Sequence, residues 1–288
     1  MCYIQQFVDH DPSTDASDFT CGSLSYDGHK GTDFGLPTLA AQHAGVDVLA
    51  AAPGTVLGVR NDMSDILQDS PDAPDVTGRE CGNGVVISHG DGWETQYCHL
   101  AQGSVSVQPG QAVAAGQVLG RIGLSGQTEF PHLHLSVRKD GAVIDPFDPD
   151  GNITCAAPST NSLWTTPLHW SPTAFIDVGF SSFVPEYAAI KAGDAHNTIL
   201  AASDPIVLFG LAFGGQSEDQ ITFTIQNPDG DIIHQQNMTL DRQQAQYFRA
   251  SGRRAPALGW PSGTYLGEIV LIRAGVVIDR TTANVSVE

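Results

Sequence analysis

Two histidines, His132 and His134, stand one residue apart in the segment FPHLHLSV, residues 130–137. Alternate side chains of a β-strand point to the same face, so both imidazoles would project together from this strand-forming segment. In a chain with 10 histidines such a pair also arises by chance. A catalytic zinc site needs three protein ligands and one open position. The pair therefore indicates a metal centre only if further ligands lie elsewhere in the chain.

A second group of candidate ligands lies far upstream, in the segment YDGHKGTDFG, residues 26–35. His29 and Asp33 are four residues apart there, and the three surrounding glycines favour a turn that leads into a strand over a helix. Together with one histidine of the later pair, they would supply two neutral imidazoles and one carboxylate. His99 is a further candidate, because it lies at the end of a hairpin that turns at residues 90–92.

The order of these motifs along the chain resembles a known family. The segments follow one another as HKGTD, VDVLAAAPGTVLGV, GNGVVISHGDGWETQYCHL, VQPGQAVAAGQVLGRIGLSGQTEFPHLHLSV and IDP. In this order, over residues 25–147, they resemble the lysostaphin/LytM-type zinc endopeptidases, peptidoglycan hydrolases with a duplicated-hybrid-motif β fold. The resemblance implies that the metal ligands are His29, Asp33 and His134, and that His99 and His132 are the catalytic pair.

The resemblance also implies the chemistry and its partner. One Zn²⁺ ion would polarise a scissile carbonyl and lower the pKa of its water toward ~7. His99 and His132 would share the roles of general base and oxyanion donor, and the sequence does not assign them individually. The substrate would be the peptide stems of peptidoglycan, with the D-Ala–diaminopimelate cross-link as the expected target. Phe130 departs from the family pattern, which usually has Gly before Pro-His-Leu-His, and could narrow the cleft.

Two other functions are compatible with parts of the sequence. The first is a non-catalytic regulator of cell-wall hydrolases on the same scaffold. Such relatives typically lack ligands, whereas all five key positions are present here, which favours the enzyme. The second is a biotinyl or lipoyl carrier. The segments VDVLAAAPGTV and QPGQAVAAGQVLG resemble the half-motifs of such carrier domains. A carrier needs an attachment lysine on a hairpin turn, and none of the three lysines, Lys30, Lys139 and Lys191, lies in one.

Short β-branched runs between 31 glycines and 17 prolines predict an all-β chain of two domains. We expect an antiparallel β-sheet peptidase domain with a groove, followed by an immunoglobulin-like β-sandwich that lacks the Cys–Trp–Cys signature. A short helix is expected around Leu39–His43. The expected boundaries are 1–150 for the peptidase domain (core 25–147, acidic insertion 61–80), 151–163 for a linker and 164–288 for the sandwich. The insertion is expected to be a solvated loop.

The five cysteines form no C-x-x-C pair, which argues against a zinc knuckle. Folding of the central hairpin would bring Cys81 near Cys98, and Cys2 and Cys21 could close a second loop, leaving Cys155 free. Cys98 would face the side of its strand opposite to His99. Two disulfides indicate an oxidising compartment. We therefore expect a periplasmic or secreted bacterial protein whose leader peptide has been removed.

The net charge of −19, with 13 Lys and Arg, argues against nucleic acid and anionic membranes as partners. No stretch approaches the ~18 consecutive apolar residues of a membrane span. The oligomeric state remains open. Five histidines have no partner pattern and are expected at the surface or in the packed interior: His10, His43, His169, His196 and His234. Stacking on sugars is an alternative for Trp164, Trp170 and Trp260, for which core packing is the expected role.

Overall fold

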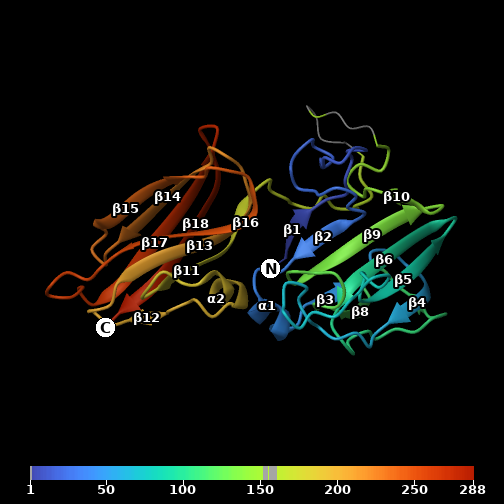
Figure 1. Ribbon diagram of the computed structural model, residues 1–288, viewed down its shortest axis with the longest axis horizontal. Helices are drawn as coiled ribbons and strands as arrows, with labels where there is room; N and C mark the ends of the chain where they lie inside the picture. Colours follow the sequence, from blue (N-terminus) through green and yellow to red (C-terminus); the bar gives the residue numbers. More distant parts are fainter. Residues whose placement is uncertain (1, 152–154, 156–160) are drawn as a thin grey trace. The chain divides into compact units, whose positions relative to one another are not determined.

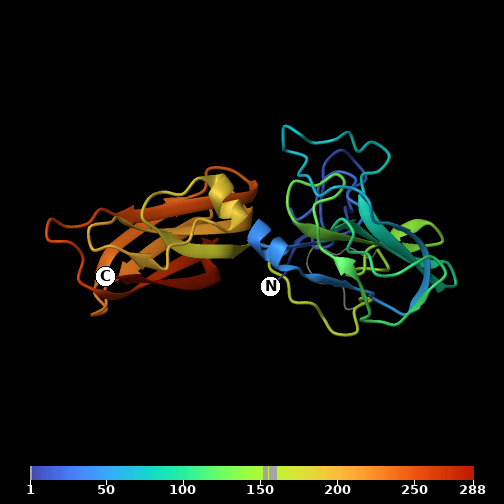
Figure 2. The same ribbon diagram turned by 90° about the horizontal axis from the view of Figure 1, so that it is seen from below.

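The computed structural model describes residues 2–151, 155 and 161–288. The chain divides into two compact units, Met1–Trp170 and Ser171–Glu288. The predicted all-β class is confirmed, because strands dominate both units and the described residues contain two short helices, α1 (Leu39–Ala44) and α2 (Tyr187–Ala192) (Figures 1 and 2). Helix α1 is the one expected from the sequence. Most of the expected linker, 151–163, lies outside the described residues.

The first unit is built on one large antiparallel sheet with the strand order β1-β2-β9-β6-β5-β4-β7, and β10 pairs with β9. A two-stranded sheet of β3 (Asp47–Leu49) and β8 (Val118–Arg121) accompanies it. The strands of the large sheet are β1 (Tyr3–Gln6), β2 (Thr32–Gly35), β4 (Gly54–Arg60), β5 (Asn83–Gly90), β6 (Trp93–Leu100), β7 (Ala112–Val113), β9 (His132–Lys139) and β10 (Ala142–Ile144).

One face of this sheet forms the core of the first unit. Strand β9 turns Leu135 and Val137 into that core, where they join Val85, Ile87 and Tyr97 of the neighbouring strands. Because side chains alternate along a strand, the residues of β9 that alternate with Leu135 and Val137 lie on the opposite face. The histidines of the HxH motif are among them. The core thus dictates which face can carry the polar site.

The N-terminal segment is an integral part of the first unit. Strand β1 adds to the edge of the large sheet beside β2. Beyond β1, the ring of Phe7 contacts the rings of Phe19, Phe147 and Trp170, with centroids 5.0, 5.0 and 5.4 Å away. Aromatic rings at these separations make favourable edge-to-face contacts. The cluster therefore ties the first 20 residues to the segment that follows β10.

The same aromatic cluster explains a wrong prediction about the disulfides. The Cys81–Cys98 disulfide is confirmed, but Cys21 pairs with Cys155 and not with Cys2. Cys2 is an exposed free cysteine. Phe19 stacks on Phe147 at 5.5 Å, which carries the loop around Cys21 toward Cys155, 134 residues away in sequence. The sequence pattern of this region shows no sign of such a distant contact.

The acidic insertion, residues 61–80, is a loop of turns and irregular backbone, as predicted. It is nevertheless anchored to the sheet. Asp65 accepts hydrogen bonds from the backbone N–H groups of Gln102 and Leu124, at 2.8 and 2.7 Å. Asn83 accepts from the Met63 N–H and donates to the Met63 carbonyl, at 2.8 and 2.7 Å. These contacts fix one end of the loop against β5.

The second unit is a sandwich of two sheets. One has the order β11-β13-β16 and the other β12-β18-β17-β14-β15, and their inner faces share one hydrophobic core. Strand β12 pairs in parallel with β18, an exception to the antiparallel prediction. The immunoglobulin-like topology stays a prediction. The strands are β11 (Ala174–Ser181), β12 (Ile199–Leu200), β13 (Ile206–Gly215), β14 (Gln220–Gln226), β15 (Ile232–Thr239), β16 (Gln244–Arg253), β17 (Gly263–Arg273) and β18 (Val276–Val287).

Within the described part of the chain, no helix has the length and apolarity needed to cross a bilayer.

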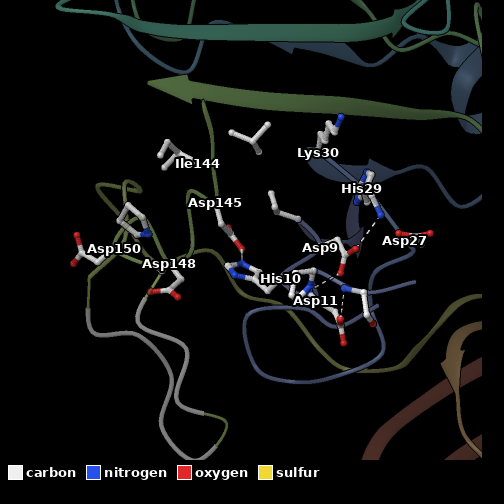
Figure 3. A pocket seen from close by; sticks show the side chains of 17 residues that line it. Asp9, His10, Asp11, Asp27, His29, Lys30, Ile144, Asp145, Asp148 and Asp150 are labelled. Carbon is white, nitrogen blue, oxygen red and sulfur yellow. Dashed lines mark hydrogen bonds and ion pairs between the residues drawn. The ribbon is translucent and has the colours of Figure 1, made fainter. Parts of the chain in front are cut away.

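His10, expected to be a surface or packing residue, instead forms an ion pair in the first unit. Its Nε2 lies 2.8 Å from Oδ2 of Asp145, inside a pocket of about 570 Å³ lined by several aspartates (Figure 3). Burial disfavours the charged imidazole, but the hydrogen bond and charge of Asp145 outweigh burial and raise the pKa of His10. The pair joins the N-terminal segment to the segment after β10.

We predict that His10→Gln destabilises the first unit in a pH-dependent manner. Since the folded pKa of His10 is raised, its stabilising contribution is fully present below the unfolded pKa of ~6.5 and is lost as pH rises through the folded value. Calorimetric unfolding should show a loss of about 1.5 kcal/mol at pH 5.5 and little loss at pH 9. The exposed His43→Gln is the control. An equal loss at both pH values would contradict the prediction.

Candidate metal centre

Three predicted ligands meet where β2 runs beside β9. Asp33 of β2 is the direct register partner of His134 of β9. Directly opposed residues share one face of a sheet, and Oδ1 of Asp33 lies 2.8 Å from Nδ1 of His134. His29, in the turn before β2, places its Nε2 3.2 Å from the same Oδ1 and 3.1 Å from His134 Nδ1. Asp33 and His29 are almost completely buried, and His134 is partly exposed.

Gly31, in the middle of the HKGTD motif, is required by this close approach. A Cβ at this position would lie 2.6 Å from His134 Nε2 and 2.7 Å from the Leu135 carbonyl oxygen. Any other residue would push β2 away from β9. Glycine therefore permits the turn to pass against the histidine that shares the site.

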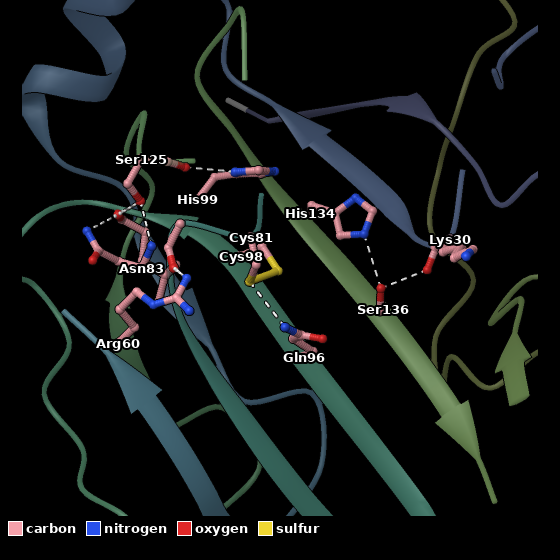
Figure 4. Close-up of a disulfide and its surroundings, with 12 residues drawn as sticks. Lys30, Arg60, Cys81, Asn83, Gln96, Cys98, His99, Ser125, His134 and Ser136 are labelled. Carbon is pink, nitrogen blue, oxygen red and sulfur yellow. Dashed lines mark hydrogen bonds between the residues drawn. A yellow bond between two sulfur atoms is a disulfide. The ribbon is translucent and has the colours of Figure 1, made fainter. Parts of the chain in front are cut away.

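Hydrogen bonds fix the tautomers of the two ligand imidazoles. The Nδ1–H of His29 donates to the Phe7 carbonyl at 2.6 Å, which leaves Nε2 bare. The hydroxyl of Ser136 donates to the Lys30 carbonyl at 2.7 Å, so its oxygen accepts the Nε2–H of His134 at 3.1 Å (Figure 4). Nδ1 of His134 is then the bare nitrogen. Such partners orient ligating rings in metal sites.

Sequence reasoning did not identify these partners. Ser136 carries a weak signal, because it follows His134 by two residues and so lies on the same face of β9. Phe7 carries none, since its contribution is a backbone carbonyl from a distant segment.

The geometry of the three bare atoms fits a tetrahedral metal ion. Zinc bonds of ~2.0–2.1 Å at tetrahedral angles place ligand atoms about 3.3 Å apart. The three pairwise distances here are 2.8, 3.1 and 3.2 Å. Among the described His, Cys, Asp and Glu residues, His29, Asp33 and His134 form a group whose ligand atoms lie close enough together to hold one metal ion. Two imidazoles and one carboxylate are a donor set that suits zinc.

His99 and His132, the predicted catalytic pair, lie beside this group. Their ring centroids are 4.6 Å apart, and the His99 ring is 6.1 Å from that of His134. The Nδ1–H of His99 donates to the Ser125 carbonyl at 2.8 Å. The Nδ1 of His132 lies 3.0 Å from both the Phe130 carbonyl and the Thr128 hydroxyl oxygen. Each ring therefore keeps a bare Nε2.

Burial and neighbouring charges set the protonation of the site. Burial, together with the nearby imidazoles, holds the pKa of His99 well below its usual range, and burial lowers the pKa of His132. Burial alone would raise the pKa of Asp33, but the surrounding imidazoles hold it well below its usual range. Burial alone would lower the pKa of His29, but Asp33 raises it. His99 and His132 are thus neutral near pH 7, as proton acceptors must be.

His99 reaches this site because β6 contains a bulge. The pairing of β5 with β6 passes from Val85↔Tyr97 to Asn83↔Leu100, so Gly84 alone faces both Cys98 and His99. Tyr97 and Leu100 both enter the core although they are three residues apart. Cys98 is the register partner of His134 and shares its face. The expectation that Cys98 and His99 face opposite sides is therefore wrong, because a bulge interrupts the alternation.

Phe130, the departure from the family pattern, contacts His132 of the predicted catalytic pair. Its ring stacks on His132 with centroids 4.3 Å apart and an interplanar angle of 22°. A narrowing of the cleft by this ring stays a prediction. The Trp residues behave as expected: Trp170 and Trp260 pack in aromatic or hydrophobic clusters, and Trp164 contacts Phe34 and Phe147.

Part of the chain is similar in sequence to known proteins. Residues 27–146 match peptidase family M23. This segment is an M23 domain. The chain is 36% identical over 109 residues to the peptidoglycan DD-endopeptidase ShyA of Vibrio cholerae. This match covers 38% of this chain and 20% of ShyA. It is 41% identical over 71 residues to the cell division protein DipM of Caulobacter vibrioides, covering 24% of this chain and 11% of DipM.

Solved structures also match parts of the chain. The catalytic domain of lysostaphin from Staphylococcus simulans has 24% identity and a TM-score of 0.31, with 42% of this chain and 77% of that domain covered. The catalytic domain of the prophage-encoded M23 protein EnpA from Enterococcus faecalis has 24% identity and a TM-score of 0.35, with 50% and 88% covered. The matched part of the chain spans a fifth or less of the length of ShyA and DipM.

We predict that Ser136→Ala weakens metal binding by the M23 domain. The substitution removes the acceptor that holds the Nε2–H of His134, and loss of such a partner typically lowers metal affinity 10- to 100-fold. Competition with a chromophoric chelator should show a zinc Kd raised by about tenfold or more. The exposed Ser106→Ala is the matched control. An unchanged affinity in Ser136→Ala would refute the role assigned to this hydroxyl.

Proposed function

We propose that this protein is a zinc-dependent endopeptidase that hydrolyses peptide cross-links of bacterial peptidoglycan, with the D-Ala–diaminopimelate link as its target. The observation that carries the proposal is the convergence of five side chains from distant segments, His29, Asp33, His99, His132 and His134. Two relatives support the substrate class, since ShyA and ShyB of Vibrio cholerae are peptidoglycan DD-endopeptidases.

In the proposed mechanism, His29, Asp33 and His134 hold one Zn²⁺ ion. When bound, zinc supplies Lewis acidity that polarises a scissile carbonyl and makes water a better nucleophile. The Phe7 carbonyl and the Ser136 hydroxyl keep the rings of His29 and His134 in place, with their bare nitrogens 3.2 and 2.8 Å from Oδ1 of Asp33, where they would hold the ion. Asp33 adds one negative charge that balances part of the ion's charge.

His99 and His132 are the proposed proton-transfer and charge-stabilising groups. Both rings are buried and neutral, and each Nδ1–H is engaged by a protein acceptor. Their bare Nε2 atoms can each take a proton from an attacking water, and the resulting N–H can be donated to the developing oxyanion or to the leaving amine. A positioned side chain of this kind typically contributes 10²–10⁴-fold to the rate.

The complete set of side chains favours an enzyme over a non-catalytic regulator. A regulator would have no need to keep the tautomers of four imidazoles fixed or to bury two neutral histidines beside the ligand group. We also propose an extracytoplasmic location, which the two disulfides and the cell-wall substrate of the relatives support.

The first test compares the wild type with His134→Ala. We expect about one zinc per wild-type chain and release of fragments from cross-linked muropeptides, with both lost in His134→Ala. Mass spectrometry of the fragments identifies the bond, and a pentaglycine substrate serves as the comparison. If the wild type binds no zinc and cleaves neither substrate, the proposal is wrong.

A second variant separates chemistry from metal binding. His99→Ala leaves all three ligands in place, so zinc content should stay at the wild-type level. The rate of cleavage should fall by 10²-fold or more, because one of two proton-transfer groups is missing. Full activity in metal-loaded His99→Ala would exclude His99 from the mechanism. Loss of zinc in this variant would instead assign it to the ligand shell.

A further inference from the structure

Cys81, a residue outside the strand, contacts both residues of the bulge in β6. Its Sγ is bonded to Cys98, the first bulge residue, and its carbonyl accepts the backbone N–H of His99, the second, at 2.8 Å (Figure 4). A Cβ on Gly84, opposite the bulge, would lie 2.4 Å from the Tyr97 carbonyl oxygen and 3.1 Å from Cys81 Sγ. The disulfide, the hydrogen bond and this glycine therefore meet at one point of the strand.

His99 needs such support because its backbone is strained. Its φ is +61°, in the left-handed region that residues other than glycine rarely adopt. Residues in such regions persist only where the surrounding structure holds them, and they cluster at functional sites. Regular pairing in place of the bulge would turn His99 into the core, on the side of Tyr97. The bulge is thus what brings the imidazole to the metal centre.

The segment 123–125 holds His99 from its other side. The N–H of Gly123 donates to the His99 carbonyl, and the Ser125 carbonyl accepts the ring Nδ1–H, both at 2.8 Å. The Ser125 hydroxyl accepts the Asn83 N–H at 2.8 Å and donates to the Leu100 carbonyl at 2.7 Å. These contacts join the segments 81–83, 98–100 and 123–125. The disulfide links the first two of them covalently.

We propose that the Cys81–Cys98 disulfide is a positioning element for His99: without it the protein keeps its metal ion and loses turnover. The three ligands come from β2, β9 and the turn before β2, and none of them belongs to the bulge or to the segments that hold it. Loss of the covalent link frees Cys81, and with it the acceptor of the His99 N–H. The turnover part of this inference rests on the proposed function.

The second disulfide of the same unit provides a matched control. Cys21–Cys155 closes a loop of 134 residues, against 17 for Cys81–Cys98. Because a cross-link restricts the unfolded chain more when its loop is longer, the loss of Cys21–Cys155 should lower the Tm more. In the described part of the chain, none of the residues that hydrogen-bond to the five site side chains belongs to that disulfide. Loss of Cys21–Cys155 should therefore mainly lower the Tm, whereas loss of Cys81–Cys98 should mainly lower turnover.

The experiment compares full-length, zinc-loaded C81A/C98A and C21A/C155A with the wild type on a defined cross-linked muropeptide. For C81A/C98A we expect kcat lowered tenfold or more, KM within twofold and zinc content unchanged. For C21A/C155A we expect the larger fall in Tm and an unchanged kcat. Wild-type kcat in C81A/C98A, or loss of its zinc along with activity, would overturn the inference. An equal fall in kcat in both variants would also overturn it, as it would reveal general destabilisation.

A second measurement does not depend on turnover. The Nδ1–H of His99 that donates to Ser125 should give a protected imidazole proton signal in NMR spectra of the wild type. We expect this signal to be lost in C81A/C98A and retained in C21A/C155A. Its retention in C81A/C98A would refute the positioning role. A wild type that cleaves no muropeptide would refute the proposed function, and the imidazole signal would still decide the role of the disulfide.

Discussion

The register between β2 and β9 is the constraint on which the site depends. Asp33 lies directly opposite His134 only because Phe34 faces Leu133 and Thr32 faces Leu135 in the same antiparallel ladder. A slip of one residue would exchange the two faces of β9 and would turn both of its histidines into the core. The hydrophobic alternation of Leu133, Leu135 and Val137 opposes such a slip. The apolar face thus determines the position of the polar one.

Around this ladder, hydrogen-bond acceptors set the tautomers of the imidazoles of the site. A carbonyl from the N-terminal segment sets His29, a serine two residues along sets His134, and a carbonyl of the segment after β8 sets His99. Acceptors in fixed places determine which nitrogen of each ring carries the proton. Four histidines packed together could otherwise adopt many combinations of tautomers, and most of them would present an N–H where a bare nitrogen is needed.

The five candidate site residues were named because their motifs, in this order, resemble the lysostaphin/LytM-type endopeptidases, and the all-β class was predicted from short β-branched runs between glycines and prolines. HxH on a strand, a glycine-rich turn before Asp33 and a histidine at a hairpin end are readable without knowledge of distant contacts. The pairing of Cys21 with Cys155, the ion pair of His10 and the carbonyl of Phe7 could not be read in this way. Each lies beside an aromatic cluster whose members Phe7 and Trp170 are 163 residues apart in sequence.

The bulge at His99 was missed for a different reason. A strand pattern predicts alternation, and an extra residue breaks it without a change in composition. Gly84, on the facing strand, was the available clue, since an isolated glycine in a strand often marks a bulge.

The Phe7 carbonyl has a consequence for how the molecule can be divided. The part that matches the M23 family begins at residue 27, yet the acceptor that orients a proposed ligand ring lies 20 positions before that boundary. The ring of Phe7 is in turn packed against Trp170, beyond the other end of the match. A fragment cut at the family boundaries would keep every residue of the site and lose part of what orients them. For transplantation into another protein, the smallest intact module is the whole first unit, from β1 to Trp170.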